Sequence, residues 1–172
     1  MITNFLLDHS ALVPVVFIVI AAVCVGVGCL ITRIRRYRQR ILWMLVMLSV
    51  LPVVGLTLVP AAGRAGDVGC VVQFAMPTLT RVELLANVAL FFPPVFFATL
   101  ATRRPLLMLA AGAGLSAAIE AVQAVVPALG RACDTNDWTM NTIGTILAVL
   151  LGSATIALTN RAVLDRDRAD RG

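Results

Sequence analysis

The sequence predicts an all-α integral membrane protein, a bundle of five transmembrane helices forming the single domain 1–172. Composition supports this, because 60% of the residues are hydrophobic, only 13% are charged and the mean hydropathy is +0.95. A soluble domain would carry about 25% charged residues. The apolar residues also fall into five runs of roughly 20 residues, the length that a helix needs to cross a bilayer.

The first three runs are separated by segments of very different composition. The run 12–31 ends at an arginine-rich segment, and the run 41–59 contains Pro52, which we expect to bend it. A loop rich in glycine and proline leads to the run 82–101. A Pro-Pro pair in the middle of that run removes two backbone donors and so frees the carbonyl groups one turn earlier. Neighbouring helices must supply partners for these carbonyls, or the helix must bend there.

The last two runs have clear ends. The run 105–126 begins at Pro105, which suits the first position of a helix, and it stops before Pro127 and Gly130. The run 138–158 is followed by a tail that mixes acidic and basic residues and is typical of a solvated end. The chain therefore reads as one bundle without a second domain.

The arginines predict the orientation. Eleven of the fourteen basic residues fall on one side of the five spans, which the positive-inside rule assigns to the cytoplasm. The N-terminus is then outside and the C-terminus inside. Because the arginines cluster at the ends of apolar runs, the net charge of +5 does not indicate a nucleic-acid partner. The three arginines predicted outside are Arg64, Arg81 and Arg131.

The fourth span carries a polar stripe. Gly112, Ser116, Glu120 and Gln123 are spaced 4, 4 and 3 residues apart, so they share one helix face. An ionisable group within a span costs roughly 2.5–3.5 kcal/mol on insertion scales, which makes it a functional candidate. Small residues allow close helix approach, so we expect this face to turn into the bundle.

Polar residues also occur at the starts of the third and fifth spans. Glu83 and Asn87 are four residues apart and share a face, as do Asp137 and Asn141. Asp134 would join the second pair if the fifth helix begins early, or it would be the N-cap of that helix. Together with the fourth span, these residues give three polar sets.

Topology brings the three polar sets to one depth. At about 1.5 Å per residue, Glu120 lies roughly 10 Å below Pro127. Asn141 lies roughly 6 Å below Asp137 by the same rule. We therefore expect an outward-facing polar pocket, walled by the third, fourth and fifth spans. The alternative is that these residues only join the helices by hydrogen bonds.

The cysteines fit the same orientation. Cys70 and Cys133 both fall in predicted outer loops, where a disulfide can persist, and we hypothesise that they pair. The alternative is two free loop thiols. Cys24 and Cys29 lie in the first span and are read as small buried apolar residues.

Three fragments in the C-terminal half give a family resemblance: NVALFFPP, LSAAIEAVQAVVP and RACDTNDWTMNTIG. In this order and spacing, the region 83–152 resembles the VanZ-like family of bacterial membrane proteins. Pro94 stands where the family pattern has a glycine, and Cys133 is an addition beside the motif. The matching positions are Asn87, Phe92, Pro93, Ser116, Glu120, Gln123, Arg131, Asp134, Asp137, Asn141 and Gly144.

The resemblance implies a protein of the bacterial cell membrane. The founding member of the family is associated with low-level resistance to teicoplanin. Many members lie outside resistance clusters, so the resemblance does not imply resistance for this chain.

The first functional hypothesis is binding or modification of an amphiphilic envelope molecule, such as a lipoglycopeptide, a lipid-linked wall precursor or a phospholipid. Arg131 would hold a phosphate or carboxylate through a charge-assisted fork. The remaining candidate ligands are Glu83, Asn87, Ser116, Gln123, Asp134 and Asn141.

The second hypothesis is an enzyme, in which the carboxyl groups of Glu120 and Asp137 divide the acid and base roles. No cofactor is predicted, although Glu120, Asp134 and Asp137 would also suit Mg²⁺ or Ca²⁺. The single histidine and scattered cysteines argue against zinc. A third hypothesis, a small transporter, is less favoured because we see no internal repeat.

Overall fold

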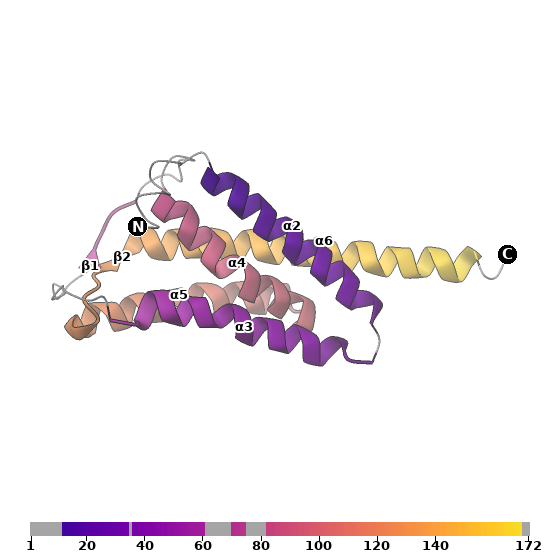
Figure 1. The fold of residues 1–172 in the computed structure, drawn as a ribbon, viewed down its shortest axis with the longest axis horizontal. Helices are drawn as coiled ribbons and strands as arrows, with labels where there is room; N and C mark the ends of the chain where they lie inside the picture. Colours follow the sequence, from indigo (N-terminus) through magenta and orange to yellow (C-terminus); the bar gives the residue numbers. More distant parts are fainter. Residues whose placement is uncertain (1–11, 35, 61–69, 75–81, 170–172) are drawn as a thin grey trace.

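The computed structural model describes residues 12–34, 36–60, 70–74 and 82–169, with the side chains of 12, 83 and 163–169 left aside (Figure 1). Its five long helices all have the length and apolar character needed to cross a membrane. The predicted all-α, multi-pass membrane bundle is therefore confirmed. The helices are α2 (Leu12–Arg33), α3 (Arg38–Leu58), α4 (Val82–Thr102), α5 (Pro105–Val125) and α6 (Thr135–Ala169).

Helix α4 is the centre of the bundle. Of its membrane-spanning window, 67% is buried, against 17–33% for the other four helices. Phe91, Phe92 and Phe96 are fully buried, and Phe92 stacks on Phe96 with ring centroids 5.7 Å apart. Phe17 of α2 meets Phe92 edge-on at 5.6 Å. These large aromatic side chains supply the surface around which the other helices pack.

The two helices with proline in their interior are both continuous. Helix α3 runs through Pro52, and α4 runs through Pro93 and Pro94 without a break in helical assignment. Helix α4 is enclosed by its neighbours, the setting in which a membrane helix tolerates proline.

Helix α6 is longer than predicted at both ends. It begins at Thr135, three residues before the predicted span, and continues to Ala169 through the segment expected to be a tail. Its 35 residues correspond to roughly 52 Å at about 1.5 Å per residue. A hydrocarbon core is only about 30 Å thick, and Figure 1 shows the end of α6 projecting past the other helices.

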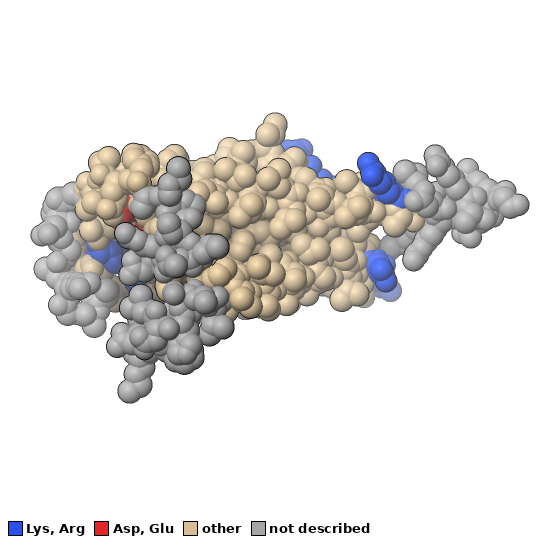
Figure 2. Space-filling model, turned by 90° about the horizontal axis from the view of Figure 1, so that it is seen from above, with Lys and Arg blue, Asp and Glu red and all other residues tan. Residues whose placement is uncertain are grey.

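The two ends of the bundle differ in charge. The α2–α3 and α4–α5 connections lie at one end, which we call the arginine end; Figure 2 shows basic side chains gathered there. The opposite end, which we call the polar end, carries Arg131. Arg64 and Arg81 lie outside the described residues. The described basic side chains of the arginine end are Arg33, Arg36, Arg38, Arg40, Arg103, Arg104 and Arg161.

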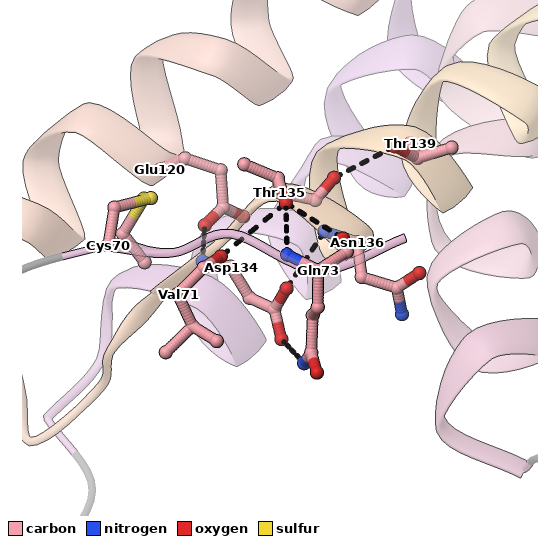
Figure 3. The surroundings of a disulfide bond; sticks show 9 residues. Cys70, Val71, Gln73, Glu120, Asp134, Thr135, Asn136 and Thr139 are labelled. Atoms are coloured by element: carbon pink, nitrogen blue, oxygen red, sulfur yellow. Dashed lines mark hydrogen bonds between the residues drawn. A yellow bond between two sulfur atoms is a disulfide. The ribbon is translucent and has the colours of Figure 1, made fainter. Parts of the chain in front are cut away.

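A short parallel ladder joins two connections at the polar end. Strand β1 (Cys70–Val71) pairs with β2 (Cys133–Asp134), and Cys70 lies opposite Cys133. The two cysteines form a disulfide, as predicted, with their Cα atoms 4.5 Å apart (Figure 3). Cys24 and Cys29 are free thiols. The disulfide thus fixes the segment before α4 to the start of α6.

Candidate functional site

A cavity of about 110 Å³ lies at the polar end, between α3, α4, α5 and α6. Seven of its ten lining residues have polar side chains, in contrast to the apolar surface of the spans. We call it the polar cavity. Its lining residues are Leu56, Thr57, Ala86, Asn87, Leu90, Glu120, Gln123, Arg131, Asp137 and Asn141.

The stripe on α5 supplies one wall. Gly112, Ser116, Glu120 and Gln123 are all buried, which confirms that this face turns into the bundle. Glu120 Oε2 accepts a hydrogen bond from the backbone N–H of Asp134 at 2.8 Å (Figure 3). The Glu120 side chain of α5 is therefore held in place by the backbone segment that leads into α6.

Gln123 joins α5 to α3. Its Nε2 donates to the carbonyl oxygen of Thr57 at 2.9 Å. Thr57 lies in the last turn of α3, where carbonyl groups have no partner within the helix. Gln123 thus satisfies a carbonyl that α3 itself leaves unpaired, and it brings α3 into the cavity wall.

Helix α6 supplies the opposite wall through two side-chain hydrogen bonds. Asn87 Nδ2 of α4 donates to Asp137 Oδ1 at 2.6 Å. Asn141 Nδ2 donates to Ser116 Oγ of α5 at 2.9 Å, and both residues are buried. These contacts tie α6 to both neighbouring helices at the depth of the cavity.

Glycine allows the helices to come this close. A Cβ on Gly144 of α6 would collide with the backbone carbonyl oxygen of Val88 on α4. A Cβ on Gly112 of α5 would lie 2.7 Å from Oγ1 of Thr145 on α6. Glycine at both positions is therefore required by packing between α4, α5 and α6.

Two polar atoms of the lining residues lack partners. Within the described part of the chain, Arg131 Nε and Asn141 Oδ1 are buried and make no hydrogen bond. Leaving a buried polar group unsatisfied costs about 1–3 kcal/mol, and more when the group is charged. Gly130, in the left-handed conformation with φ 62°, turns the chain immediately before Arg131. Two residues that line the polar cavity therefore each carry a buried polar atom, one donor and one acceptor, whose hydrogen bond is unmet.

The chain matches the family model described as VanZ/LLP1 over residues 15–157. The chain belongs to the VanZ/LLP1 family. The match begins in α2, so it extends well beyond the region 83–152 on which the resemblance was drawn. Comparisons with curated proteins and with solved structures found no match.

This VanZ/LLP1 chain brings most of the predicted site residues together. Asn87, Glu120, Gln123, Arg131, Asp137 and Asn141 all line the polar cavity. Ser116 does not line the cavity, but it accepts a hydrogen bond from Asn141, which does. The side chain of Glu83 lies outside the described residues.

Asp134 has a different position. Its Oδ1 accepts the backbone N–H of Asn136 at 2.8 Å, the geometry of an N-cap at the start of α6. Its Oδ2 accepts from the side-chain amide of Gln73 (Figure 3). Of the two interpretations left open by the sequence, the structure favours the N-cap, and it explains why α6 begins early.

The sequence did not indicate the α3 wall or Gln73. Thr57 contributes through its backbone carbonyl, for which a side-chain pattern gives no signal. Gln73 could have been inferred only after the Cys70–Cys133 pairing, because that pairing brings the segment after Cys70 alongside Asp134 and Thr135. Thr135 Oγ1 accepts the N–H of Gln73 at 3.0 Å and donates to its carbonyl at 2.8 Å.

The three carboxylates considered as cation ligands do not converge. Glu120 and Asp137 line the cavity, whereas both oxygens of Asp134 accept hydrogen bonds elsewhere. Among the described residues, no group of three acidic, histidine or cysteine side chains is close enough to hold a metal. A cation in the cavity would have two protein carboxylates and the amide oxygen of Asn141 near it, and would take its remaining ligands from water.

Proposed function

We propose that this VanZ/LLP1 protein binds the head group of an amphiphilic cell-envelope molecule in the polar cavity. The observation that carries the proposal is the buried Nε of Arg131, which has no partner among the described residues. A guanidinium group binds phosphate or carboxylate through parallel hydrogen bonds. A head-group oxygen at this position would satisfy the donor that the protein leaves open.

The other residues that line the polar cavity narrow the chemistry of the head group that it can bind. Glu120 and Asp137 also line the cavity, so it offers carboxyl oxygens beside the Arg131 guanidinium. A head group that carries hydroxyl or ammonium donors beside its phosphate or carboxylate would suit both signs of charge. Such groups occur in phospholipids, in lipid-linked wall precursors and in lipoglycopeptides.

The size of the cavity limits what can be enclosed. Pockets for drug-sized ligands usually measure about 300–1,000 Å³. At about 110 Å³, the polar cavity has room for a small head group and not for a whole lipoglycopeptide. If the protein lowers susceptibility to teicoplanin, it would do so by binding a smaller envelope molecule and not by enclosing teicoplanin itself. The positive-inside orientation would place this cavity in the outer half of a bacterial cell membrane.

A second candidate function is catalysis on the same head group. Glu120 and Asp137 face one cavity and have different hydrogen-bond partners, a backbone N–H and an amide. Two carboxyl groups in unequal surroundings can divide the acid and base roles. A transporter is not favoured, because the described residues of the cavity all lie at one end of the bundle.

The two candidates are separated by mass spectrometry of purified protein incubated with phosphatidylglycerol and, separately, with a lipid-linked wall precursor. For binding, wild type retains an unchanged molecule, and Arg131→Gln loses it. For catalysis, a new product appears that Glu120→Gln abolishes. Arg104→Gln is the matched control, because Arg104 is an exposed arginine at the other end. Equal retention by wild type and Arg131→Gln, with no product, contradicts the proposal.

A further inference from the structure

An apolar groove of about 370 Å³ is lined by residues of α2, α3 and α4. We call it the α2–α3 groove. The two helices are joined at the arginine end and diverge toward the polar end, where α4 lies between them. Val16 of α2, on the groove wall, is 50% exposed. In a membrane, such an exposed apolar side chain faces lipid, so the groove opens sideways into the bilayer.

Small residues on α4 create the depth of the groove. Ala86 and Ala89 are three residues apart on one face and contribute little volume where a larger side chain would fill the space. Ser49 of α3 carries the lining's one hydroxyl group. That hydroxyl donates to the carbonyl oxygen of Leu45 in its own helix at 2.7 Å. The groove therefore presents apolar surface with no unsatisfied side-chain donor.

The groove and the polar cavity share a wall. Ala86 and Leu90 of α4 line both spaces. A molecule with its head group in the polar cavity would thus have its apolar part beside the α2–α3 groove. Arg131, whose Nε has no partner among the described residues, lines the polar cavity on the other side of this shared wall.

We propose that the α2–α3 groove holds one acyl chain of a phosphate-bearing glycerolipid whose head group occupies the polar cavity, an inference that rests on the function proposed above. The lining of α4 extends from Val82 to Pro93, roughly 17 Å along the helix. This is about half of the 30 Å hydrocarbon core, the depth of one leaflet, which a single acyl chain spans. A polyisoprenyl chain is longer and is methyl-branched, so it fits this groove less well.

Photo-crosslinking tests the groove directly. Purified protein is placed in phosphatidylcholine vesicles that contain phosphatidylglycerol with a diazirine on one acyl chain, and adducts are mapped by peptide mass spectrometry. In wild type, adducts fall on α3 and α4 residues of the groove. Ala89→Phe and Ser49→Phe each fill the groove from a different helix. One methylene in an apolar pocket changes affinity by about 10–200-fold, so each variant should lose at least roughly tenfold of these adducts.

Ala110→Phe is the matched control, because Ala110 is exposed on α5 and does not line the groove. It should retain the wild-type adducts. Size-exclusion profiles and thermal unfolding establish that the three variants are folded. With two blocking variants from separate helices, misfolding of one leaves the other to decide the outcome.

A short-chain phosphatidylglycerol separates this inference from the head-group proposal. If the groove variants retain the short-chain lipid but lose the long-chain adducts, the inference holds. If they crosslink like wild type while Arg131→Gln loses lipid, the groove inference is wrong and the head-group site stands. If Arg131→Gln leaves retention unchanged, one ligand does not bridge both spaces. Preferential labelling by a diazirine-bearing polyisoprenyl phosphate would likewise overturn the choice of a glycerolipid.

Discussion

Asn87 of α4 donates a hydrogen bond of 2.6 Å to Asp137 of α6, joining residues that are 50 positions apart in the chain. The bond links the central helix to the helix that carries the acidic wall of the polar cavity. Together with the Asn141–Ser116 and Gln123–Thr57 bonds, it places the cavity between four helices. Helices hold a site more rigidly than loops do.

Replacing Asn87 with Leu should lower the free energy of unfolding by about 0.6 kcal/mol and by no more than about 1.7 kcal/mol, the range measured for hydrogen bonds between membrane helices. Leu is similar in size to Asn and lacks the amide that donates to Asp137. The measurement is denaturant unfolding in mixed micelles. Asp137→Asn keeps an acceptor oxygen and should be the milder change. A loss well above this range in Asn87→Leu would mean that Asn87 does more than bond to Asp137.

Gly144→Ala should be strongly destabilising, because the new methyl group would meet the backbone carbonyl of Val88 and force α6 away from α4. Overpacking of this kind costs about 1–3 kcal/mol. Gly114→Ala is the matched control, because a Cβ there meets nothing within 4 Å. Alanine is a better helix former than glycine by about 1 kcal/mol in soluble helices, so the control should be neutral or stabilising. Thermal unfolding of both variants in detergent checks the difference. Similar melting temperatures for the two would contradict the close α4–α6 approach.

Reduction of the Cys70–Cys133 disulfide should release residues 70–74 from the start of α6 and lower stability. The bridge closes a sequence separation of 63 residues, for which loop entropy allows up to about 4 kcal/mol. The real loss should be smaller, because membrane helices already restrict the unfolded chain. Unfolding with and without reductant measures it, and Cys70→Ser with Cys133→Ser reproduces the reduced state.

The same cysteines test orientation. Intact cells treated with reductant and a membrane-impermeant maleimide should be labelled on Cys70 and Cys133, because a persistent disulfide belongs on the oxidising side. Variants that retain only Cys24 and Cys29 serve as the control and should remain unlabelled. Labelling of the pair only after the membrane is opened would reverse the predicted topology.

The site residues that the sequence predicted correctly were found mainly from helical periodicity. The spacing of Ser116, Glu120 and Gln123 placed them on one face, and the antiparallel order of the spans placed that face beside Asn141. Both follow from local geometry together with span length. The region around Cys70 became predictable only through its pairing with Cys133.

What the sequence did not predict depends on backbone groups and on helix separation. The α3 wall is joined through the carbonyl of Thr57, which every residue type possesses. The role of Asp134 depended on where α6 begins, and boundaries shift by a few residues with the capping hydrogen bond. The α2–α3 groove depends on how far two apolar helices diverge, and apolar periodicity alone does not specify this.

Gln123→Leu should lower stability and lipid retention together. The change removes the donor to Thr57 and puts an apolar side chain of similar size in its place, so the last turn of α3 loses its partner on α5. We expect a loss of about 0.6–1.7 kcal/mol in the free energy of unfolding. Gln39→Leu is the control. Gln39 also donates from its side chain to a backbone carbonyl, that of Ala101, but at the arginine end. Gln39→Leu should affect stability without changing lipid retention.

Glu120→Gln and Glu120→Ala separate the charge of this residue from its structural role. Glu120 accepts the backbone N–H of Asp134, and the amide oxygen of Gln can accept the same hydrogen bond. Glu120→Gln should therefore unfold at nearly the wild-type temperature. Glu120→Ala leaves the N–H of Asp134 without this acceptor and should lower the free energy of unfolding by about 1–3 kcal/mol.

If Glu120→Gln is folded and retains lipid but forms no product that wild type forms, Glu120 acts by its charge or proton in catalysis. If it retains lipid and wild type forms no product, Glu120 serves the structure, and head-group binding is carried by Arg131. Equal destabilisation by Gln and Ala would show that the hydrogen bond to Asp134 requires the charged carboxylate.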